Sequence, residues 1–425
     1  MRPGPVTHTR IRSGPSATTR AGAALAEIRP LVPFFCLYVS FGATLGFLSG
    51  AVPLILRAQG LDLTEVGLLQ LINLPVGLTF LWALALDRVR LPVLPHRTGW
   101  IAAAQAVTIG LLCLLSLGAH WPLAALLGIA IAACAGSATM DIALEALVVE
   151  TVLAERRAFM ASAKLCGASL GGILGVGVLV GAYEILGWRN AVLACAALDL
   201  ACLLPILRYP EARLRGSSAR DRAPERLSGA LSRLRTLVPR ILALGAYFAA
   251  AYLISGPNTL ALLDLGVSLP QVGFLTGTVL PAVNLVMALV AGGLAARFGT
   301  LRLIAAGGLG VLATGGLMAA ACAAEAAWLA VAATVLNFLC GGILGVPVFR
   351  MIYTWAQGPR PATDYALLFG AAFFAAMPLR VAAPAIAGGL GWPGYFAAAL
   401  PVYALAVAWL AVTIARTRPE SGAAP

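Results

Sequence analysis

The chain has 425 residues, of which 60% are hydrophobic and 11% are charged, and its mean hydropathy is +0.92. This composition excludes a soluble globular protein, because one globular core could not hide so much apolar surface, and it indicates that lipid is the solvent of most of the chain. The net charge of +12 does not indicate a nucleic-acid partner, because the 29 basic residues are scattered between apolar runs of about twenty residues.

Residues 1–30 are polar and basic, and they lack the short apolar core of a cleaved signal peptide. We therefore predict a cytoplasmic N-terminal tail, followed by a first apolar run that stays in the membrane. All eight cysteines lie in apolar runs, without a CxxC or a Cys/His spacing. This pattern predicts that they pack in the interior, and it favours neither disulfides nor a metal site.

Apolar runs bounded by charged residues, proline or glycine predict twelve membrane spans. Each span should be a helix, because a backbone amide in hydrocarbon finds a partner only within its own segment. Runs this long without period-two alternation also exclude a transmembrane barrel. The predicted spans are 31–57, 65–86, 100–118, 122–149, 160–183, 187–208, 241–261, 270–296, 303–323, 326–349, 366–387 and 392–415.

The spans fall into two groups of six, so we predict an all-α integral membrane protein with an N-terminal half (31–208) and a C-terminal half (241–415). A basic cytoplasmic loop (209–240) joins them, and a second cytoplasmic tail covers 416–425. The distribution of charge supports this map, because loops on the cytoplasmic side collect Lys and Arg. The outer loops hold only Arg57 and Arg189, whereas Lys164 is assigned with its basic neighbours to the inner side.

A short repeat relates the two halves. The segments from Gly60 to Leu69 and from Gly266 to Leu275 share Gly, Leu, Val, Gly and Leu in register, and the pair Leu74-Pro75 recurs as Leu280-Pro281. Each copy joins the first span of its half to the second. A parallel duplication of six-span halves is the organisation of major-facilitator transporters, whose substrate site lies between the halves near the middle of the bilayer.

The loop after the second span of each half strengthens this resemblance. The family carries a Gly-x-x-x-Asp-Arg-x-Gly pattern there, and this chain has degraded copies of it at 83–88 and 292–299. The resemblance implies that Asp87, Arg88 and Arg297 clamp neighbouring helix ends as a cytoplasmic gate. The alternative is that Arg88 and Arg297 are topology charges only.

Two carboxylates lie deep in the fourth predicted span. Asp141 and Glu145 are separated by four residues, so they share one helix face, and ionisable groups at this depth are rare and usually functional. Paired carboxylates in a cavity of low dielectric constant favour proton uptake, which predicts a proton-coupling site. The alternative is a structural pair that neutralises Arg156, Arg157 or Lys164.

Arg380 is predicted to be the one cation deep within a span, in the eleventh. A guanidinium at this depth suits a carboxylate of the substrate, or it pairs with Asp141 or Glu145 across the two halves. Asn284 and Tyr38 are further candidates for the substrate site.

The first half, over about residues 35–180, resembles one branch of the major facilitator superfamily, which holds muropeptide permeases, acetyl-CoA transporters and single-protein siderophore permeases. The residues that carry this resemblance are Leu37-Tyr38-Val39-Ser40, Gly46-Phe47, Gln59-Gly60-Leu61, Val66-Gly67-Leu68-Leu69, Phe80-Leu81-Trp82-Ala83, Asp87-Arg88 and Thr139-Met140-Asp141-Ile142-Ala143. The resemblance implies secondary active transport of a small organic solute across the inner membrane, driven by protons. Short loops favour a siderophore as cargo; a muropeptide permease, and then drug or metabolite efflux, are the alternatives.

Other classes of function fit the sequence less well. The three histidines (His8, His96 and His120) lie in three different loops or tails, so they do not build a catalytic site, and no phosphate-binding Gly-Lys-Ser/Thr loop is present. We therefore predict a transporter that is not an enzyme, uses no cofactor or metal, and works as a monomer. Its expected partners are a small-molecule substrate, protons and the lipid bilayer.

Overall fold

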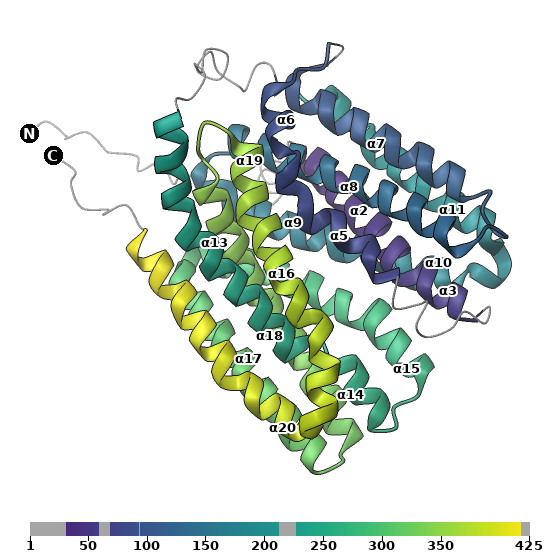
Figure 1. Cartoon of the computed structure of the whole chain (residues 1–425), viewed down its shortest axis with the longest axis vertical. Helices are drawn as coiled ribbons and strands as arrows, with labels where there is room; N and C mark the ends of the chain where they lie inside the picture. The colour runs from purple at the N-terminus through teal and green to yellow at the C-terminus, as the bar shows by residue number, and fades with distance from the viewer. Residues whose placement is uncertain (1–30, 59–68, 93, 212–226, 418–425) are drawn as a thin grey trace, which may run out of the picture.

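The computed structural model describes residues 31–58, 69–92, 94–211 and 227–417, and in these ranges the chain is helical without a β-strand (Figure 1). Eleven helices of the described part are long and apolar enough to cross a membrane, and Leu71–Leu81 is a shorter apolar helix at the place of the second predicted span. The all-α membrane fold predicted from the sequence is confirmed. The N-terminal tail (1–30), the C-terminal tail from residue 418 and the first copy of the repeat from Gly60 to Leu68 lie outside the described residues.

The described part of the first half contains five helices that are long and apolar enough to cross a membrane, together with the shorter helix Leu71–Leu81. Several are assembled from consecutive α-, 3-10 and π-helical segments, so that one crossing carries more than one label. The segments are α2 (Val32–Gly46), η2 (Phe47–Ala51), α3 (Val52–Ala58), η3 (Leu69–Asn73), α5 (Leu74–Leu78), η4 (Thr79–Leu81), α6 (Ala83–Arg88), α7 (His96–Leu115), α8 (Leu123–Thr151), η5 (Ala154–Arg156), α9 (Arg157–Gly172), η6 (Ile173–Val178), α10 (Leu179–Gly181), α11 (Tyr183–Leu203) and η7 (Ile206–Arg208).

The second half contains six of the candidate spans, and the last element, α20, contributes to two of them. Figure 1 shows α20 doubling back on itself, and the reversal is at Gly391, whose φ of 68° is favourable only for glycine. The segments are α13 (Leu227–Ser255), α14 (Asn258–Asp264), α15 (Leu269–Phe274), η9 (Leu275–Val279), α16 (Leu280–Phe298), α17 (Thr300–Ala323), α18 (Ala327–Trp355), α19 (Pro361–Tyr365), η10 (Ala366–Ala371) and α20 (Ala372–Arg416).

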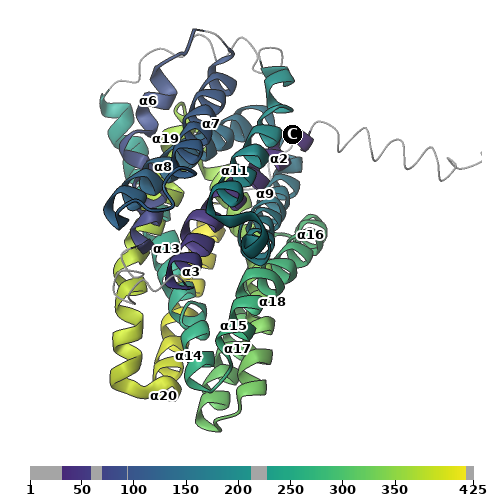
Figure 2. The same ribbon diagram turned by 90° about the vertical axis from the view of Figure 1, so that its right-hand side faces the viewer.

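The two halves are separate bundles that pack side by side. In both views the helices of the first half (α2 to α11) and those of the second half (α13 to α20) gather in different parts of the molecule, and α6, α8 and α19 lie near one another (Figure 2). Across this junction α9 packs along α16 and α18, while α19 packs on α6 and α8. We call the end of the bundle at which α2 begins and α20 ends the terminal face.

Glycines allow α2 and α9 to touch through their backbones. A Cβ atom at Gly171 would overlap the carbonyl oxygen of Val39, and one at Gly42 would overlap that of Ala168. Small residues at helix contacts allow such close approach in membrane proteins, where van der Waals packing and not the hydrophobic effect holds helices together. This contact fixes the position of α9 in the first half.

Two segments differ from the prediction. The second span is broken into 3-10 and α pieces instead of one helix, with Pro75 in the first turn of α5, where the missing N–H costs no hydrogen bond. The central loop is shorter than predicted, because its last part, from Leu227 to Arg240, belongs to α13. Arg233 in that part forms an ion pair with Asp364 of 3.3 Å, so the early turns of α13 are anchored to α19.

Candidate functional site

The two carboxylates of α8 share one face, as their spacing requires, and both are buried. Asp141 is 4% exposed and Glu145 is fully buried. From Asp141 to the end of α8 at Thr151 is about 15 Å of helix, so the pair lies well below the terminal face. Because neither side chain reaches water, each needs a partner inside the protein.

That partner is Lys164 of α9. Its Nζ donates to Asp141 Oδ1 at 2.8 Å, to Glu145 Oε1 at 2.6 Å and to the hydroxyl oxygen of Tyr365 at 3.0 Å. Lys164 is only 4% exposed and lies within the candidate span Ala154–Gly181, so its assignment to an inner loop was wrong, and Arg380 is not the only cation placed within a span. Of the three partners considered for the carboxylate pair, the structure selects Lys164.

Aromatic rings enclose the ammonium group. Tyr38 and Phe41 approach from α2, and three rings approach from the second half, with ring centroids 5.4–5.7 Å from Nζ: Phe349 of α18, Tyr365 of α19 and Phe369 of η10. The hydroxyls of Tyr38 and Tyr353 lie 3.5 Å apart beside this cage. Cation–π contact is strongest where water is excluded, so the rings stabilise a charge that the bilayer disfavours. We call Asp141, Glu145, Lys164 and Tyr365 the lysine cluster.

The lysine cluster joins the two halves, because three of its members belong to the first half and Tyr365 to the second. With all three ionisable groups charged, two carboxylates face one ammonium, so the cluster carries a net charge of −1 in a buried place. Binding one proton neutralises it. A site with this charge balance is suited to loading and releasing a proton.

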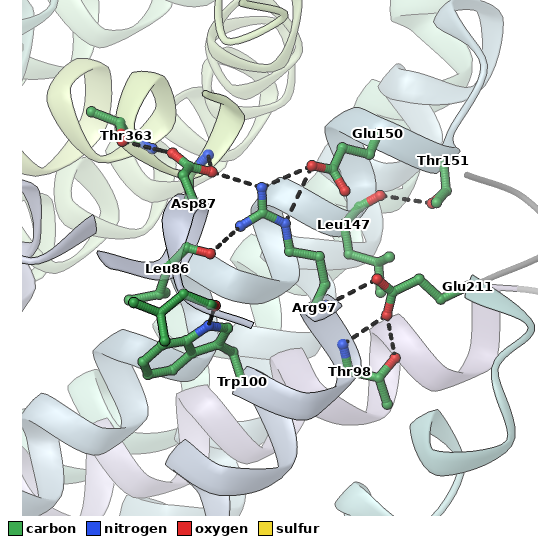
Figure 3. A network of polar contacts seen from close by, with 12 residues as sticks. Leu86, Asp87, Arg97, Thr98, Trp100, Leu147, Glu150, Thr151, Glu211 and Thr363 are labelled. Carbon is green, nitrogen blue, oxygen red and sulfur yellow. Dashed lines mark hydrogen bonds and ion pairs between the residues drawn. The ribbon is translucent and has the colours of Figure 1, made fainter. Parts of the chain in front are cut away.

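A second polar network lies at the terminal face and is built around Asp87 and Arg97 (Figure 3). Asp87 accepts from Arg97 Nη2 at 2.7 Å, and across the junction it accepts from the backbone N–H and the hydroxyl of Thr363 at 2.8 and 2.6 Å. The backbone N–H of Ala362 adds a longer contact of 3.3 Å. The carboxylate therefore fastens α6 of one half to the start of α19 in the other.

Arg97 is buried at the start of α7, and all three nitrogens of its guanidinium donate hydrogen bonds. Nε and Nη2 donate to Glu150 Oε1 at 3.2 and 2.8 Å, and Nη1 donates to the carbonyl oxygen of Leu86 at 2.9 Å. Glu211, just past the sixth span, accepts from the backbone N–H groups of Arg97 and Thr98 at 2.9 and 2.8 Å (Figure 3). We call Asp87, Arg97, Glu150 and Thr363 the arginine network.

The predicted site residues are thus only partly brought together. Tyr38 lies at the lysine cluster, whereas the Asn284 side-chain amide donates to Ser169 Oγ at 2.7 Å, across the contact between α16 and α9. Arg380 belongs to α20, but its side chain lies outside the described residues. Within the described part of the chain, the arginine network includes neither Arg88 nor Arg297. Both are exposed, and the guanidinium of Arg297 lies 5.3 Å from the ring of the adjacent Phe298.

Sequence reasoning named Lys164 only as a possible structural partner of the carboxylates and gave Arg97 no role, although the sequence held a clue to each. Lys164 falls inside the span predicted over 160–183, so its depth contradicted its assignment to a loop. Arg97 lies in the first turn of α7, just before the span predicted over 100–118, and at such a position a basic side chain can turn back towards carboxylates of neighbouring helices. The sequence spacing does not show that Asp87 of α6 and Glu150 of α8 are the partners of Arg97.

The family model of the Major Facilitator Superfamily matches residues 34–263, which is more than half of the chain. The chain belongs to this superfamily. As predicted, it is therefore a multi-pass membrane transporter and not an enzyme.

Among curated proteins, the anhydromuropeptide permease of Escherichia coli (strain K12) is 30% identical over 174 residues. This match covers 40% of the present chain and 35% of that permease, so it spans about a third of the length of that relative. The permease of E. coli O157:H7 matches equally.

Solved transporters share the fold over nearly the whole chain. The proton:xylose symporter XylE, bound to 6-bromo-6-deoxy-D-glucose, superposes with a TM-score of 0.67 at 14% identity, covering 93% of this chain and 96% of XylE. The fucose:proton symporter FucP of E. coli gives a TM-score of 0.68 at 15% identity, covering 93% and 99% of the two chains. At these identities the likeness shows the fold alone.

Proposed function

We propose that this transporter imports a small organic solute across the inner membrane together with protons, with both termini in the cytoplasm. The observation that carries the proposal is the lysine cluster, in which a buried ammonium binds two carboxylates of one half and a hydroxyl of the other. Ionisable groups at this depth are costly to keep, so a structural role alone is a poor reason for three of them.

Protonation changes which partners Lys164 can hold. When one carboxylate takes up a proton, its attraction for the ammonium falls, while the bond to Tyr365 and the rings of the second half remain available. Because Lys164 contacts both halves, the number of protons bound and the packing of the halves depend on each other. Transport by alternating access requires such a link between a bound ion and the orientation of the halves.

The arginine network is proposed to hold the cytoplasmic face closed. Asp87 joins α6 to α19 through two short bonds to Thr363, while Arg97, itself bound to Glu150, donates to the same carboxylate. Opening this face must break the bonds from Asp87 to the second half. Arg88 and Arg297 stay outside this proposal, because both are exposed.

An anhydromuropeptide is the first candidate cargo, since the permease of that name matches 174 residues of this chain. A siderophore, which the sequence favoured, remains a prediction and is the competing cargo in the test. Neither cargo is needed for the coupling argument, which rests on the lysine cluster.

The test uses the full chain, purified and reconstituted in proteoliposomes with an imposed pH gradient. Labelled anhydromuropeptide and a labelled ferric siderophore are offered to the wild type and to Glu145→Gln and Asp141→Asn. We expect the wild type to accumulate one solute as long as the gradient lasts. The two variants should lose accumulation but keep exchange of internal for external solute, which needs no net proton movement.

The control is Glu184→Gln, which removes a carboxylate exposed on α11 and should leave accumulation unchanged. Accumulation that survives a protonophore, or that survives both cluster variants, would refute proton coupling at this site. Accumulation of the siderophore alone would make the siderophore the cargo, and outward movement of test drugs would make the protein an exporter.

A further inference from the structure

The second copy of the degraded motif lacks the carboxylate that the first copy uses. The two copies align Asp87-Arg88 with Ala296-Arg297, so alanine stands where the arginine network has its central acid. The first copy lies at the end of α6 and the second at the end of α16, and both ends are at the terminal face. Ala296 is exposed, so the place that corresponds to the Asp87 side chain is accessible from the surface.

Arg350 of α18 makes the contact in the second half that Arg97 makes in the first. Arg97 Nη1 donates to the carbonyl oxygen of Leu86, the residue before the acid position of the first copy, at 2.9 Å. Arg350 Nη1 donates to that of Ala295, the residue before the acid position of the second copy, at 3.5 Å, and to the hydroxyl oxygen of Thr300 at 3.4 Å. Both contacts of Arg350 are long. Among the described residues, no carboxylate lies within ion-pair distance of its guanidinium.

Arg157 brings a second guanidinium to this place from the first half. It begins α9, which packs on the second copy of the motif so closely that a Cβ atom at Gly292 would overlap the hydroxyl oxygen of Ser162. Arg157 is 8% exposed, and its guanidinium contacts the side-chain amide of Gln357, which is exposed. Arg350 lies near enough to repel Arg157 electrostatically. Within the described ranges, Arg157 has no carboxylate at ion-pair distance either.

The two copies of the motif therefore carry opposite charge. The first copy sets two carboxylates, Asp87 and Glu150, against one guanidinium. The second copy has two guanidiniums, those of Arg157 and Arg350, which we call the arginine pair. Like charges held near each other are unfavourable unless an anion compensates them. A guanidinium presents its N–H donors in a plane that matches the oxygens of a phosphate group.

We propose that the arginine pair binds a phosphate group at the terminal face, either of free phosphate or of an anionic lipid headgroup. The phosphate takes the place of the carboxylate that Ala296 lacks. Basic side chains between membrane helices are suited to such headgroups. Because Arg157 belongs to the first half and Arg350 to the second, a bound phosphate ties the halves together, as Asp87 does between α6 and α19. The site is separate from the lysine cluster and depends neither on proton coupling nor on the cargo.

The first test is a titration of the full-length protein with sodium phosphate in maltoside micelles, which contain no phosphate, at constant ionic strength with chloride as the balancing anion. A ligand that binds only the folded protein raises its melting temperature. We expect this rise in the wild type. Arg157→Gln or Arg350→Gln should move its midpoint to at least about tenfold higher phosphate concentration, because each removes hydrogen bonds to a charged group. Arg156→Gln removes the same charge at an exposed neighbouring position and should titrate as the wild type does.

Nanodiscs separate the two sources of phosphate. In phosphate-free buffer, the melting temperature is compared between nanodiscs of phosphatidylcholine alone and nanodiscs that contain phosphatidylglycerol. A rise with phosphatidylglycerol that the double variant Arg157→Gln/Arg350→Gln abolishes, without a response to free phosphate, would identify a lipid headgroup as the ligand. A response to free phosphate that needs both arginines would identify a soluble anion. If neither source stabilises the wild type, or if the double variant responds as the wild type does, the proposal is overturned.

Restoring the carboxylate tests the site in the opposite direction. Ala296→Asp supplies the missing acid from the chain itself. We expect this variant to melt at a higher temperature than the wild type without phosphate and to lose the response to the anion, because the new carboxylate compensates the arginine pair. Adding Arg350→Gln should cancel the gain. An Ala296→Asp variant that folds, melts as the wild type does and still responds to phosphate would contradict the proposed place of the anion.

Discussion

The lysine cluster and the arginine network are built from the same kinds of charged groups, but they differ in how the cation is held. Each sets one buried cation of the first half against two carboxylates, and each reaches the second half through α19. The guanidinium nitrogens of Arg97 donate hydrogen bonds in a fixed arrangement to two carboxylates and a carbonyl oxygen. Lys164 is a point charge inside a cage of five rings, and its hydrogen bonds end on groups that can gain or share a proton.

The difference follows from the chemistry of the two cations. A planar guanidinium with five donors holds a fixed arrangement and keeps its charge, which suits a contact that locks. An ammonium has three donors without a fixed plane, so it can change partners at little geometric cost, which suits a group that responds to protonation. The comparison predicts that the lysine cluster is sensitive to charge and the arginine network to geometry.

The largest effect should come from Lys164→Ala. The change leaves two buried carboxylates without their cation, and we expect uptake to fall to background and the free energy of unfolding to fall by about 3–5 kcal/mol. Uptake and melting temperature in nanodiscs measure the two effects. Adding Asp141→Asn and Glu145→Gln to Lys164→Ala should restore stability but not proton-driven accumulation. A single Lys164→Ala variant that melts and transports normally would remove the lysine cluster from the mechanism.

Arg97→Lys should have the next largest effect. It keeps the charge but cannot serve Asp87, Glu150 and the Leu86 carbonyl together, so we expect a loss of about 1.5–3 kcal/mol in stability, the range for hydrogen bonds to charged groups. Glu150→Gln gives a matched comparison, because it keeps shape and removes charge. If Arg97→Lys is milder than Glu150→Gln, charge and not geometry governs the arginine network, and the contrast with the lysine cluster disappears.

Asp87→Asn should loosen the junction without unfolding the protein. An amide accepts more weakly than a carboxylate, so the bonds to Ala362 and Thr363 weaken and the cytoplasmic face opens more often. A cysteine placed at the buried position Ala362 reports this as faster labelling by a membrane-impermeant maleimide from the cytoplasmic side. We expect a rate increase of about tenfold, which corresponds to about 1.4 kcal/mol. Equal labelling rates with and without Asp87→Asn would contradict the gate.

The smallest effects should come from Arg88→Ala and Arg297→Ala. Both side chains are exposed, and changes at such positions usually alter stability by less than about 0.5 kcal/mol. Transport rates of the two variants, measured beside Asp87→Asn, should stay within about twofold of the wild type. A large loss in either variant would restore the original prediction that all three residues of the degraded motif form the gate.

The sequence by itself determined the membrane fold, the approximate spans, and the carboxylate pair. These follow from properties that one segment carries alone: apolar length, which lipid requires, and a four-residue spacing, which places Asp141 and Glu145 on one helix face.

Only the tertiary structure decided which groups meet across helices. Lys164 binds residues that are 19, 23 and 201 positions away in the chain, and Asp87 binds Thr363 at a separation of 276. No periodicity encodes such separations along the chain, because they depend on how the helices are arranged in space.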